Sequence, residues 1–538
     1  MKKIRAIILV LIGIVSLAIL ASCSKKADVD IIKVTPMRTR IGVTLKVDDP
    51  DGLITADSIK AMIYNDDDEK LDTIRFDELD ESEQTLTFDD LDEETDYKIV
   101  VKATVDDKSV TYYNKTVSTT NVGASADNPI VIKTTSEFLE IKYDDDAYYS
   151  LEADLDFADE AGNATTITPL FDASTNFMGH FDGNGHTLSN IEIDTSSTYT
   201  YSGIFGYLGI GSSVSDLNIS NITLSSTKGT YLYLGALAGC NQGTITNVHV
   251  TNASITHLGT GTSMQYIGGL VGVNCYIVEN SSVEGVTMTL RSRLQSVVGG
   301  FIGSNGGVTQ NALNGAYVSG CHVSGVDITT TFVTTHVVDK ETASNADYIQ
   351  YTGGFVGESM INIIDSYADS KITGSATFSA GSVLDTYSVA VGGFAGRVVG
   401  ASSILNCVAN STLSYTTADA YTFYAGALVG AAYDATITNS LGILSGENMI
   451  VDSADYSADS DSEVVEQYAK NFDGIGFAGS ILINPLTSIT NSGYAIAAGA
   501  TVDSTTEGAL ALASVEAVFD TTGLNEAVLA FYNSKISA

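Results

Sequence analysis

The sequence predicts an all-β protein, with an N-terminal β-sandwich followed by a right-handed parallel β-helix, or β-solenoid. Two recurring patterns between residues 128 and 500 indicate the solenoid, and alternating segments between residues 30 and 120 indicate the sandwich. The first recurring pattern is a short apolar core between small residues, as in Gly268-Gly269-Leu270-Val271-Gly272. The second is an alternating apolar and polar segment that follows each copy and usually contains Asn.

The glycine element is too short and too rich in glycine to form a helix. Its glycines permit positive φ and close approach of the backbone. The large apolar residue between them, such as Phe355 or Phe394, is expected to point into the core. The last glycines of the eight copies are Gly206, Gly239, Gly272, Gly303, Gly357, Gly396, Gly430 and Gly479.

The alternating segment is typical of a half-buried strand, and its Asn position suits a bend, because Asn tolerates the left-handed backbone region. That position holds Asp216, Asn247, Asn280, Gly320, Asp365, Asn406, Asn439 and Asn491, separated by 31 to 52 residues. A single repeat cannot enclose a core. Stacked coils can, because each strand pairs with the matching strand of the next coil.

The chain begins with a targeting segment over residues 1–22. Lys2, Lys3 and Arg5 precede an apolar stretch that is short for a transmembrane helix. The stretch Leu20-Ala21-Ser22-Cys23 resembles a bacterial lipobox, which implies cleavage before Cys23 and acylation of that residue. The alternative is an ordinary secretory signal with a chance cysteine. With the lipid anchor, the protein is expected at the outer membrane or cell surface, and residues 23–29 would be its tether.

The charge balance argues against one class of partner. The formal net charge is −39, and loss of the three basic leader residues would take it to −42. Such an acidic chain is not expected to bind nucleic acid, since binding depends on neutralising phosphates with Lys and Arg.

Residues 30–120 contain several short alternating segments separated by acidic turns, which favours a β-sandwich. The stretch Leu91-Asp92-Glu93-Glu94-Thr95-Asp96-Tyr97 is similar to the E–F corner of fibronectin type III domains, although those domains usually have Pro where Glu93 stands. The resemblance implies that Tyr97 is a corner tyrosine bonded back to the chain.

Four acidic residues in this region are weak candidates for calcium, which prefers six to eight oxygen ligands. They are Asp49, Asp51, Asp66 and Asp68. Their spacing is not that of an EF-hand, so we favour solvated acidic loops and expect no other metal or cofactor.

The stretch from Phe177 to Asn190 contains Gly179-His180-Phe181-Asp182-Gly183-Asn184-Gly185. Together with the glycine elements, it resembles the bacterial surface proteins that carry GLUG-type repeats. The resemblance covers residues 128–495 and implies a β-helical, adhesin-like surface protein. His180, Asp182 and His186 alternate like an acid–base or metal set, but we interpret them as a structural opening coil, because Asp-Gly-Asn-Gly is a turn signal.

The composition of the repeats favours binding over catalysis. Acidic and basic residues are scarce between residues 200 and 450, where only Arg291 and Arg293 form a close basic pair. A carbohydrate-active β-helix would need tuned ionisable groups. The inter-repeat segments are instead rich in Thr, Ser and Tyr, which suit a glycan or a host or extracellular protein if exposed, and are simply good strand residues if not. We expect a non-catalytic adhesin or binding module. The alternatives are a polysaccharide lyase or glycoside hydrolase, or a spacer without a ligand.

The remaining cysteines and the C-terminus complete the expectations. Cys321 and Cys407 occupy equivalent repeat positions and are expected in the core, whereas Cys240 and Cys275 lie in neighbouring repeats and are left open as a disulfide. Residues 504–538 are expected to form a helical cap on the last coil.

Overall fold

The protein is described by a computed structural model. The described residues are 27–75, 83–195, 199–259, 263–293, 295–306, 312–334, 348–378, 387–418, 422–452, 476–481, 488–497, 500–504 and 519–536. The chain is mostly β, with long parallel sheets that carry the repeats. Contacts divide it into two compact units, of which the first ends at Ile130 and the second begins at Val131.

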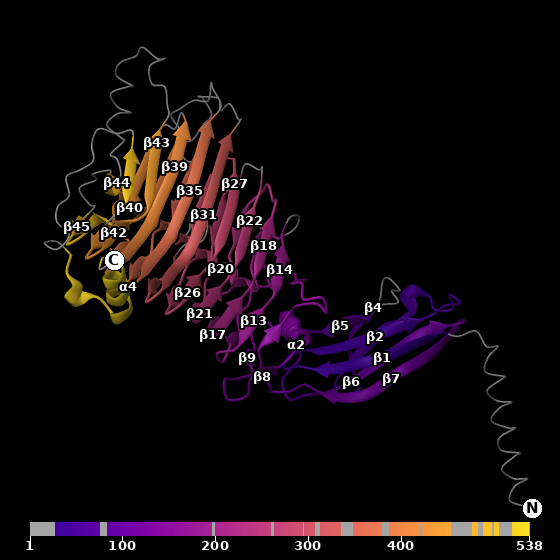
Figure 1. Cartoon of the computed structure of the whole chain (residues 1–538). Helices are drawn as coiled ribbons and strands as arrows, with labels where there is room; N and C mark the ends of the chain where they lie inside the picture. Colours follow the sequence, from indigo (N-terminus) through magenta and orange to yellow (C-terminus); the bar gives the residue numbers. More distant parts are fainter. Residues whose placement is uncertain are drawn as a thin grey trace, which may run out of the picture. The chain divides into compact units, whose positions relative to one another are not determined.

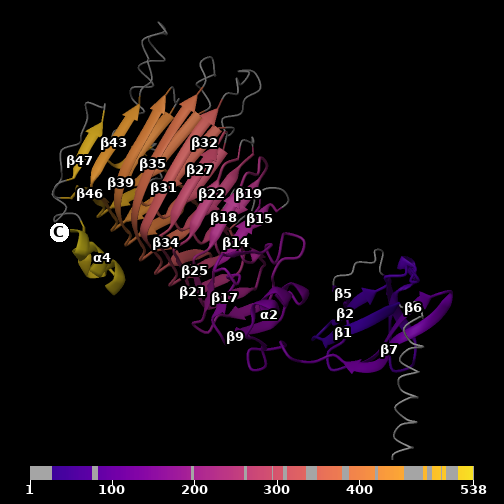
Figure 2. The same cartoon turned by 45° about the vertical axis from the view of Figure 1, so that its right-hand side comes forward.

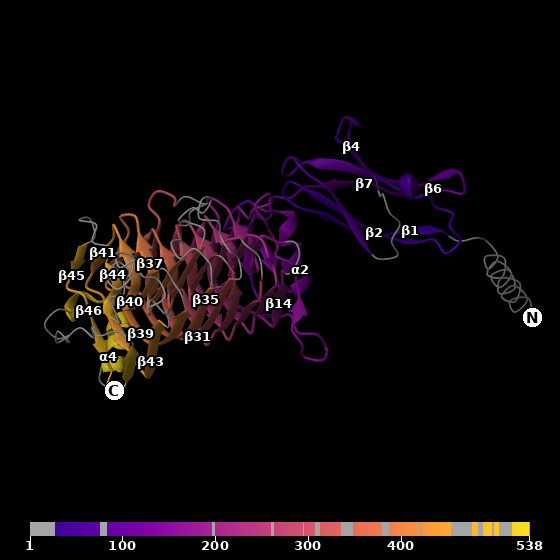
Figure 3. The same ribbon diagram turned by 90° about the horizontal axis from the view of Figure 1, so that it is seen from above.

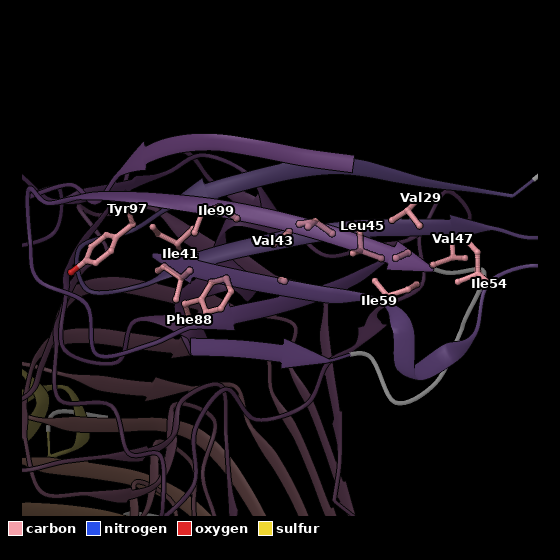
Figure 4. Close-up of a cluster of buried hydrophobic side chains, with 14 of the residues drawn as sticks. Val29, Ile41, Val43, Leu45, Val47, Ile54, Ile59, Phe88, Tyr97 and Ile99 are labelled. Carbon is pink, nitrogen blue, oxygen red and sulfur yellow. The ribbon is translucent and has the colours of Figure 1, made fainter. Parts of the chain in front are cut away.

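The first unit contains two antiparallel sheets, with strand orders β1-β2-β5 and β4-β3-β6-β7. Both sheets contribute apolar residues to one buried cluster, including Val43 and Ile99 (Figure 4). Its strands are β1 (Asp28–Pro36), β2 (Ile41–Asp48), β3 (Lys60–Tyr64), β4 (Lys70–Arg75), β5 (Gln84–Phe88), β6 (Asp96–Val105) and β7 (Lys108–Ser118), and a 3-10 turn η2 spans Ala56–Ser58.

Two of these strands were not expected. β1 begins at Asp28, inside the segment expected to be a tether, and the polar strand β4 has an irregular pairing with β3. The buried Tyr97 hydroxyl accepts a hydrogen bond of 2.9 Å from the Asp92 backbone N–H.

The second unit opens with β8 (Ile130–Ile132), the helix α2 (Thr135–Leu139) and the 3-10 turn η3 (Glu140–Tyr143). The N-cap of α2 is Thr134. Its side chain and that of Glu137 form a reciprocal capping box. Phe138 is fully buried and meets Phe157 and Phe181 edge-on, each at 5.8 Å between ring centroids. This aromatic cluster covers the core of the first coil.

Each repeat then makes one coil of a parallel solenoid, with five strand positions (Figure 1). The first position holds β9 (Tyr148–Leu151), β12 (His180–Asp182), the start of β17 (Ser213–Ser220) and of β21 (Thr244–Thr251), β25 (Ile277–Glu279), β30 (Tyr317–Ser319), β34 (Asn362–Ile364), β38 (Ser403–Leu405), β41 (Thr436–Thr438) and β45 (Ser488–Thr490). The buried residues Val214, Ile245 and Val278 pair in register here, so each repeat stacks directly on the one before.

The second and third positions continue the same sheet. The second holds β10 (Leu155–Asp156), β13 (Thr187–Ser189), the ends of β17 and β21, β26 (Ser282–Glu284), the starts of β31 (His322–Thr334), β35 (Tyr367–Phe378) and β39 (Val408–Ala418), β42 (Leu441–Leu444) and β46 (Gly493–Ile496). The third holds β11 (Thr165–Thr166), β14 (Ile191–Asp194), β18 (Thr223–Ser226), β22 (Ser254–His257), β27 (Thr287–Ser292), the ends of β31, β35 and β39, β43 (Glu447–Asp452) and β47 (Thr501–Ser504).

The fourth and fifth positions form a second parallel sheet, and the glycine element separates them. The fourth holds β15 (Tyr201–Ser202), β19 (Leu232–Leu234), β23 (Gln265–Gly268), β28 (Gln295–Gly299), β32 (Tyr348–Gly353), β36 (Tyr387–Gly392) and the start of β40 (Thr422–Tyr433). The fifth holds β16 (Gly206–Leu208), β20 (Ala238–Asn241), β24 (Val271–Asn274), β29 (Ile302–Asn305), β33 (Val356–Ser359), β37 (Ala395–Val399), the end of β40 and β44 (Gly476–Ile481). Figure 3 shows strands of successive coils side by side.

The C-terminal segment contains the 3-10 turn η7 (Thr521–Gly523) and the helix α4 (Glu526–Ile536). Of the segment expected to be a helical cap, residues 505–518 lie outside the described residues. Its described part lies against the side of the last coils, where the buried Val528 packs with Val408 and Leu441 (Figure 2).

Candidate binding faces of the solenoid

The Asn position is the first corner of each coil. All eight residues there have the left-handed backbone expected of a bend, with φ between 47° at Asn439 and 65° at Gly320. Asn side chains also link coils, as where Asn406 Nδ2 donates to Asp365 Oδ1 at 2.8 Å. A second row of left-handed residues, between the second and third strand positions, was missed. It recurs with the same period and consists of Asn190, Asn221, Asn252, Gly285 and Gly325.

The last glycines of the repeats stack from coil to coil, and we call them the glycine column. Close packing, more than backbone conformation, requires glycine at these positions. Gly206 has a φ of 64°, but Gly239 and the five glycines stacked beyond it do not adopt positive φ. A Cβ on Gly357 would lie 2.6 Å from the Gly303 carbonyl oxygen, and one on Gly396 would lie 2.6 Å from the Gly357 carbonyl oxygen. Only glycine permits this spacing. Gly479 is in β44, and its backbone continues the same ladder.

The large apolar residues of the glycine elements point into the core, as expected. Phe301, Phe355 and Phe394 are fully buried and stack across coils, with ring centroids 4.8 and 4.7 Å apart. Cys321 and Cys407 are buried beside the Asn corner, where Ser occupies the same place in other coils. Burial raises the pKa of both thiols to about 12, so they act as small core side chains.

Cys240 and Cys275 are buried free thiols in neighbouring coils. The Cys240 thiol hydrogen-bonds with that of Cys275, and burial is the main cause that raises its pKa.

The tyrosines of the inter-repeat segments are mostly buried, which favours the second of the two alternatives left open by the sequence, that they are strand residues. Tyr233, Tyr266, Tyr351 and Tyr424 lie in one register column on the fourth strand position and are at most 8% exposed. They pack against Val273 of the fifth strand position and neighbouring residues. This packing lies where the sheet bends at the glycine element, between the fourth and fifth positions. These residues therefore serve mainly as strand and packing residues, although Tyr231 is 50% exposed.

One ion pair, between the buried Glu358 and the partly exposed Arg397, lies beside this tyrosine column. Arg397 donates to Glu358 Oε1 at 2.9 Å, and the Arg397 guanidinium lies over the Tyr351 ring, 5.2 Å from its centroid. Burial raises the pKa of Glu358, while Arg397 opposes that shift. The pair joins neighbouring coils in register. A buried carboxylate so paired is a structural link unless substrate can reach it.

The candidate residues His180, Asp182 and His186 contact separate partners. His180 stacks on Tyr148 and hydrogen-bonds with Ser213 Oγ at 2.8 Å, while His186 contacts Asp154 at 3.1 Å. Asp182 accepts a hydrogen bond from the Asn184 backbone N–H within the turn. These contacts are local, but the turn is not in the opening coil that we interpreted from the sequence, because β9, β10 and β11 form the coil before it.

The second strand position presents an outward column that changes character along the solenoid. In its early coils it is polar, and His249, Ser282 and His322 follow one another in register. His322 contacts Glu284 at 3.1 Å. The pKa of His249 is lowered mainly by its burial and, to a smaller extent, by the nearby His322. The two histidines are thus separated by a whole coil.

In the last coils this column becomes apolar, with Val408 and Leu441 in register. The C-terminal segment covers it. Phe531 stacks on Tyr367 with centroids 4.3 Å apart, and Lys535 Nζ contacts Asp369 at 2.5 Å. Asn406 donates to the Gly523 carbonyl oxygen at 3.2 Å. The segment therefore occupies the face that these coils would otherwise expose.

The third strand position presents a broad outer sheet face, whose strands lie side by side at the front of Figure 1. Its central outward column consists almost only of hydroxyl side chains, all partly or fully exposed. We call this set the hydroxyl column: Ser225, Thr256, Thr289, Thr329, Thr373 and Ser414, which pair in register from coil to coil. The sequence showed that these segments are rich in Thr and Ser, but their alignment depends on a register that insertions obscure.

The remaining candidate residues either make contacts within their own region or lie outside the described residues. Asp49 accepts hydrogen bonds from the backbone N–H groups of Leu53 and Ile54, at 2.8 and 2.7 Å, and Asp68 pairs with Lys98 at 2.7 Å. Asp51 and Asp66 lie in the same two turns. Within the described ranges, His, Cys, Asp and Glu form no group of three or more that could hold a metal ion. Arg291 is exposed on β27, and Arg293 follows that strand.

Residues 1–22 and Cys23 lie outside the described residues. Among the helices that are described, none is long and apolar enough to cross a membrane. Comparison with models of known protein families and with curated proteins finds no match to this chain.

Proposed function

We propose that this protein is a lipid-anchored bacterial cell-surface protein that binds a glycan or an extracellular protein without catalysing a reaction. The observation that carries the proposal is the hydroxyl column, because it offers the same hydrogen-bonding groups to a ligand in six successive coils. Repetition of one weak contact gives a useful affinity when the ligand also repeats.

Further support comes from the sequence. The lipobox-like stretch ending at Cys23 favours export and anchoring, and the GLUG-type repeats are typical of surface proteins. The two antiparallel sheets and the Tyr97 bond are those expected of a fibronectin type III-like β-sandwich, which would carry the solenoid away from the membrane. We assign the solenoid the right-handed sense that parallel crossovers prefer.

The rival function is a carbohydrate-active β-helix enzyme, and Glu358 is the residue that favours it. Its raised pKa is a property of general acids. However, its side chain is only 2% exposed and is paired with Arg397, so a substrate would have to displace this ion pair to reach it. We therefore give this residue a structural role.

The proposal is tested with the full chain carrying Cys23→Ser, applied to an array of glycans and extracellular-matrix proteins. We expect selective binding to a small group of ligands. The unmodified chain, expressed in bacteria with a fatty-acid probe, should be labelled and the variant should not, because only the Cys thiol forms the thioether. An array without binding would favour a spacer, and label on the variant would contradict lipidation at Cys23.

A further inference from the structure

The hydroxyl column runs across the strands, along the direction in which coils stack. Neighbouring strands in a sheet are about 4.8 Å apart, so the column extends for roughly 24 Å from Ser225 to Ser414. Each step presents one Thr or Ser at the same height above the sheet, because all six side chains point outward from paired positions. The result is a straight, regular line of hydroxyl groups.

The two outward columns beside it are also mostly Thr and Ser, with longer, charged side chains at three positions. On one side Lys371 pairs with Asp327 at 3.5 Å, and on the other Arg291 is exposed in register with Thr331. These side chains project further than Thr or Ser. In these coils they rise beside the hydroxyl column, where a single chain could pass between them but a rigid, planar lattice such as ice could not lie flat.

The chemistry of the column indicates the type of chain. A hydroxyl group both donates and accepts hydrogen bonds, as sugar hydroxyls do, and the Thr methyl groups offer contact to the C–H faces of sugar rings. The column holds no charge in a protein whose formal net charge is −39, so a polyanionic chain would be repelled overall. It also lacks the aromatic and Arg anchors that dominate protein interfaces.

We infer that a neutral, extended polysaccharide binds along the hydroxyl column, with its axis across the strands and successive sugars contacting successive coils. This inference rests on the proposed binding function and names its ligand class and its site. Sugar hydroxyls exchange hydrogen bonds with the Thr and Ser hydroxyls, and the flanking Lys371 and Arg291 side chains confine the chain laterally.

The test measures retention of the full chain carrying Cys23→Ser on insoluble cellulose, chitin, starch and β-1,3-glucan. Thr329→Glu combined with Thr373→Glu places two charges in neighbouring coils at the centre of the column. Thr436→Glu combined with Ser488→Glu is the matched control, because these exposed residues are also paired in neighbouring coils but on the first strand position. A third variant, Thr329→Val with Thr373→Val, removes the hydroxyls while keeping the β-branched shape.

We expect retention of the parent on at least one polysaccharide, a loss of at least tenfold with the Glu pair, a smaller loss with the Val pair, and none with the control. Equal retention of all four proteins would overturn the assignment of the column and leave the binding function intact. Binding only to acidic glycans or proteins on the array, or thermal hysteresis in ice that the Glu pair abolishes, would contradict the ligand class. A lack of binding to any material would remove the proposed function itself. Melting curves establish that each variant is folded.

Discussion

Asn439 and Asp520 exchange two hydrogen bonds across 81 residues of sequence. Asn439 Nδ2 donates to the Asp520 carbonyl oxygen, and the Asp520 backbone N–H donates to Asn439 Oδ1, both at 2.9 Å. Asn439 is a repeat residue with a φ of 47°. One side chain thus supports a corner of the solenoid and also fixes the start of the C-terminal segment.

Asn439→Gly should keep the left-handed backbone and remove both of these bonds, together with the 2.9 Å bond that Asn439 Nδ2 donates to Asn406 Oδ1. We expect a loss of about 1–3 kcal/mol in unfolding free energy, with earlier proteolysis of the C-terminal segment, because each lost bond leaves a partly buried partner. Asn280→Gly is the control, since Asn280 shares the conformation, with a φ of 49°, but lies in an earlier coil. Similar effects of both changes would show that the Asp520 contact is unimportant.

Gly357→Ala tests the close packing of the glycine column. Its Cβ would approach backbone atoms of two strands, the Gly303 carbonyl oxygen and the Val298 nitrogen, each at 2.6 Å. Because backbone cannot move aside as a side chain does, we expect destabilisation of about 1–3 kcal/mol or more in chemical unfolding. Gly42→Ala is the comparison, since its nearest contact would be an ordinary 3.7 Å. An unchanged midpoint for Gly357→Ala would refute the packing.

Phe355→Ala should cost about 3–5 kcal/mol, because it opens a cavity between two stacked rings in a fully buried position. Phe355→Leu should cost less, since Leu270 and Leu428 occupy the equivalent place in other coils. Thermal melts that fail to separate these variants would indicate that the position is not packed as described.

His257 should make the stability of the solenoid depend on pH. Burial lowers the pKa of this histidine from 6.5 to about 4, an effect that Gln265 and the Ser226 backbone only partly offset. Above pH 6.5 the ring is neutral in both states. Between pH 6.5 and 4 the unfolded chain binds the proton more readily, so stability falls as pH falls, by up to about 3 kcal/mol.

Gln265 is the side chain whose interaction with His257 opposes this shift of the pKa. His257→Leu copies Leu290, which occupies the paired position in the next coil. The variant should lose less stability than the parent between pH 6.5 and 4, as measured by melting temperature. Parallel curves for the two proteins would contradict a neutral buried His257.

The sequence could predict those parts of the fold in which one local structural requirement selects one residue type. Asn at a corner needs a left-handed backbone, and Phe355 between glycines needs a core, so both recur visibly. The second corner was harder to recognise, because Gly285 and Gly325 replace Asn there and the chain runs straight through this place in β35.

The binding face was less predictable, because it depends on register. Tyr233 and Thr256 belong to similar Tyr- and Thr-rich segments, yet one is buried in the folded sheet and the other faces outward. The position of the C-terminal helix could not be predicted from the sequence either. Its contact with Val408 and Leu441 follows from an outward column that turns apolar only in the last coils.

The central claim, binding without catalysis, is tested most directly by incubating the purified chain with a polysaccharide that retains it and measuring chain length and new ends together. We expect the polysaccharide to stay bound with unchanged chain length and no new reducing or unsaturated ends, for the parent and for Glu358→Gln alike. Progressive shortening by the parent that Glu358→Gln abolishes would contradict the account and identify an enzyme.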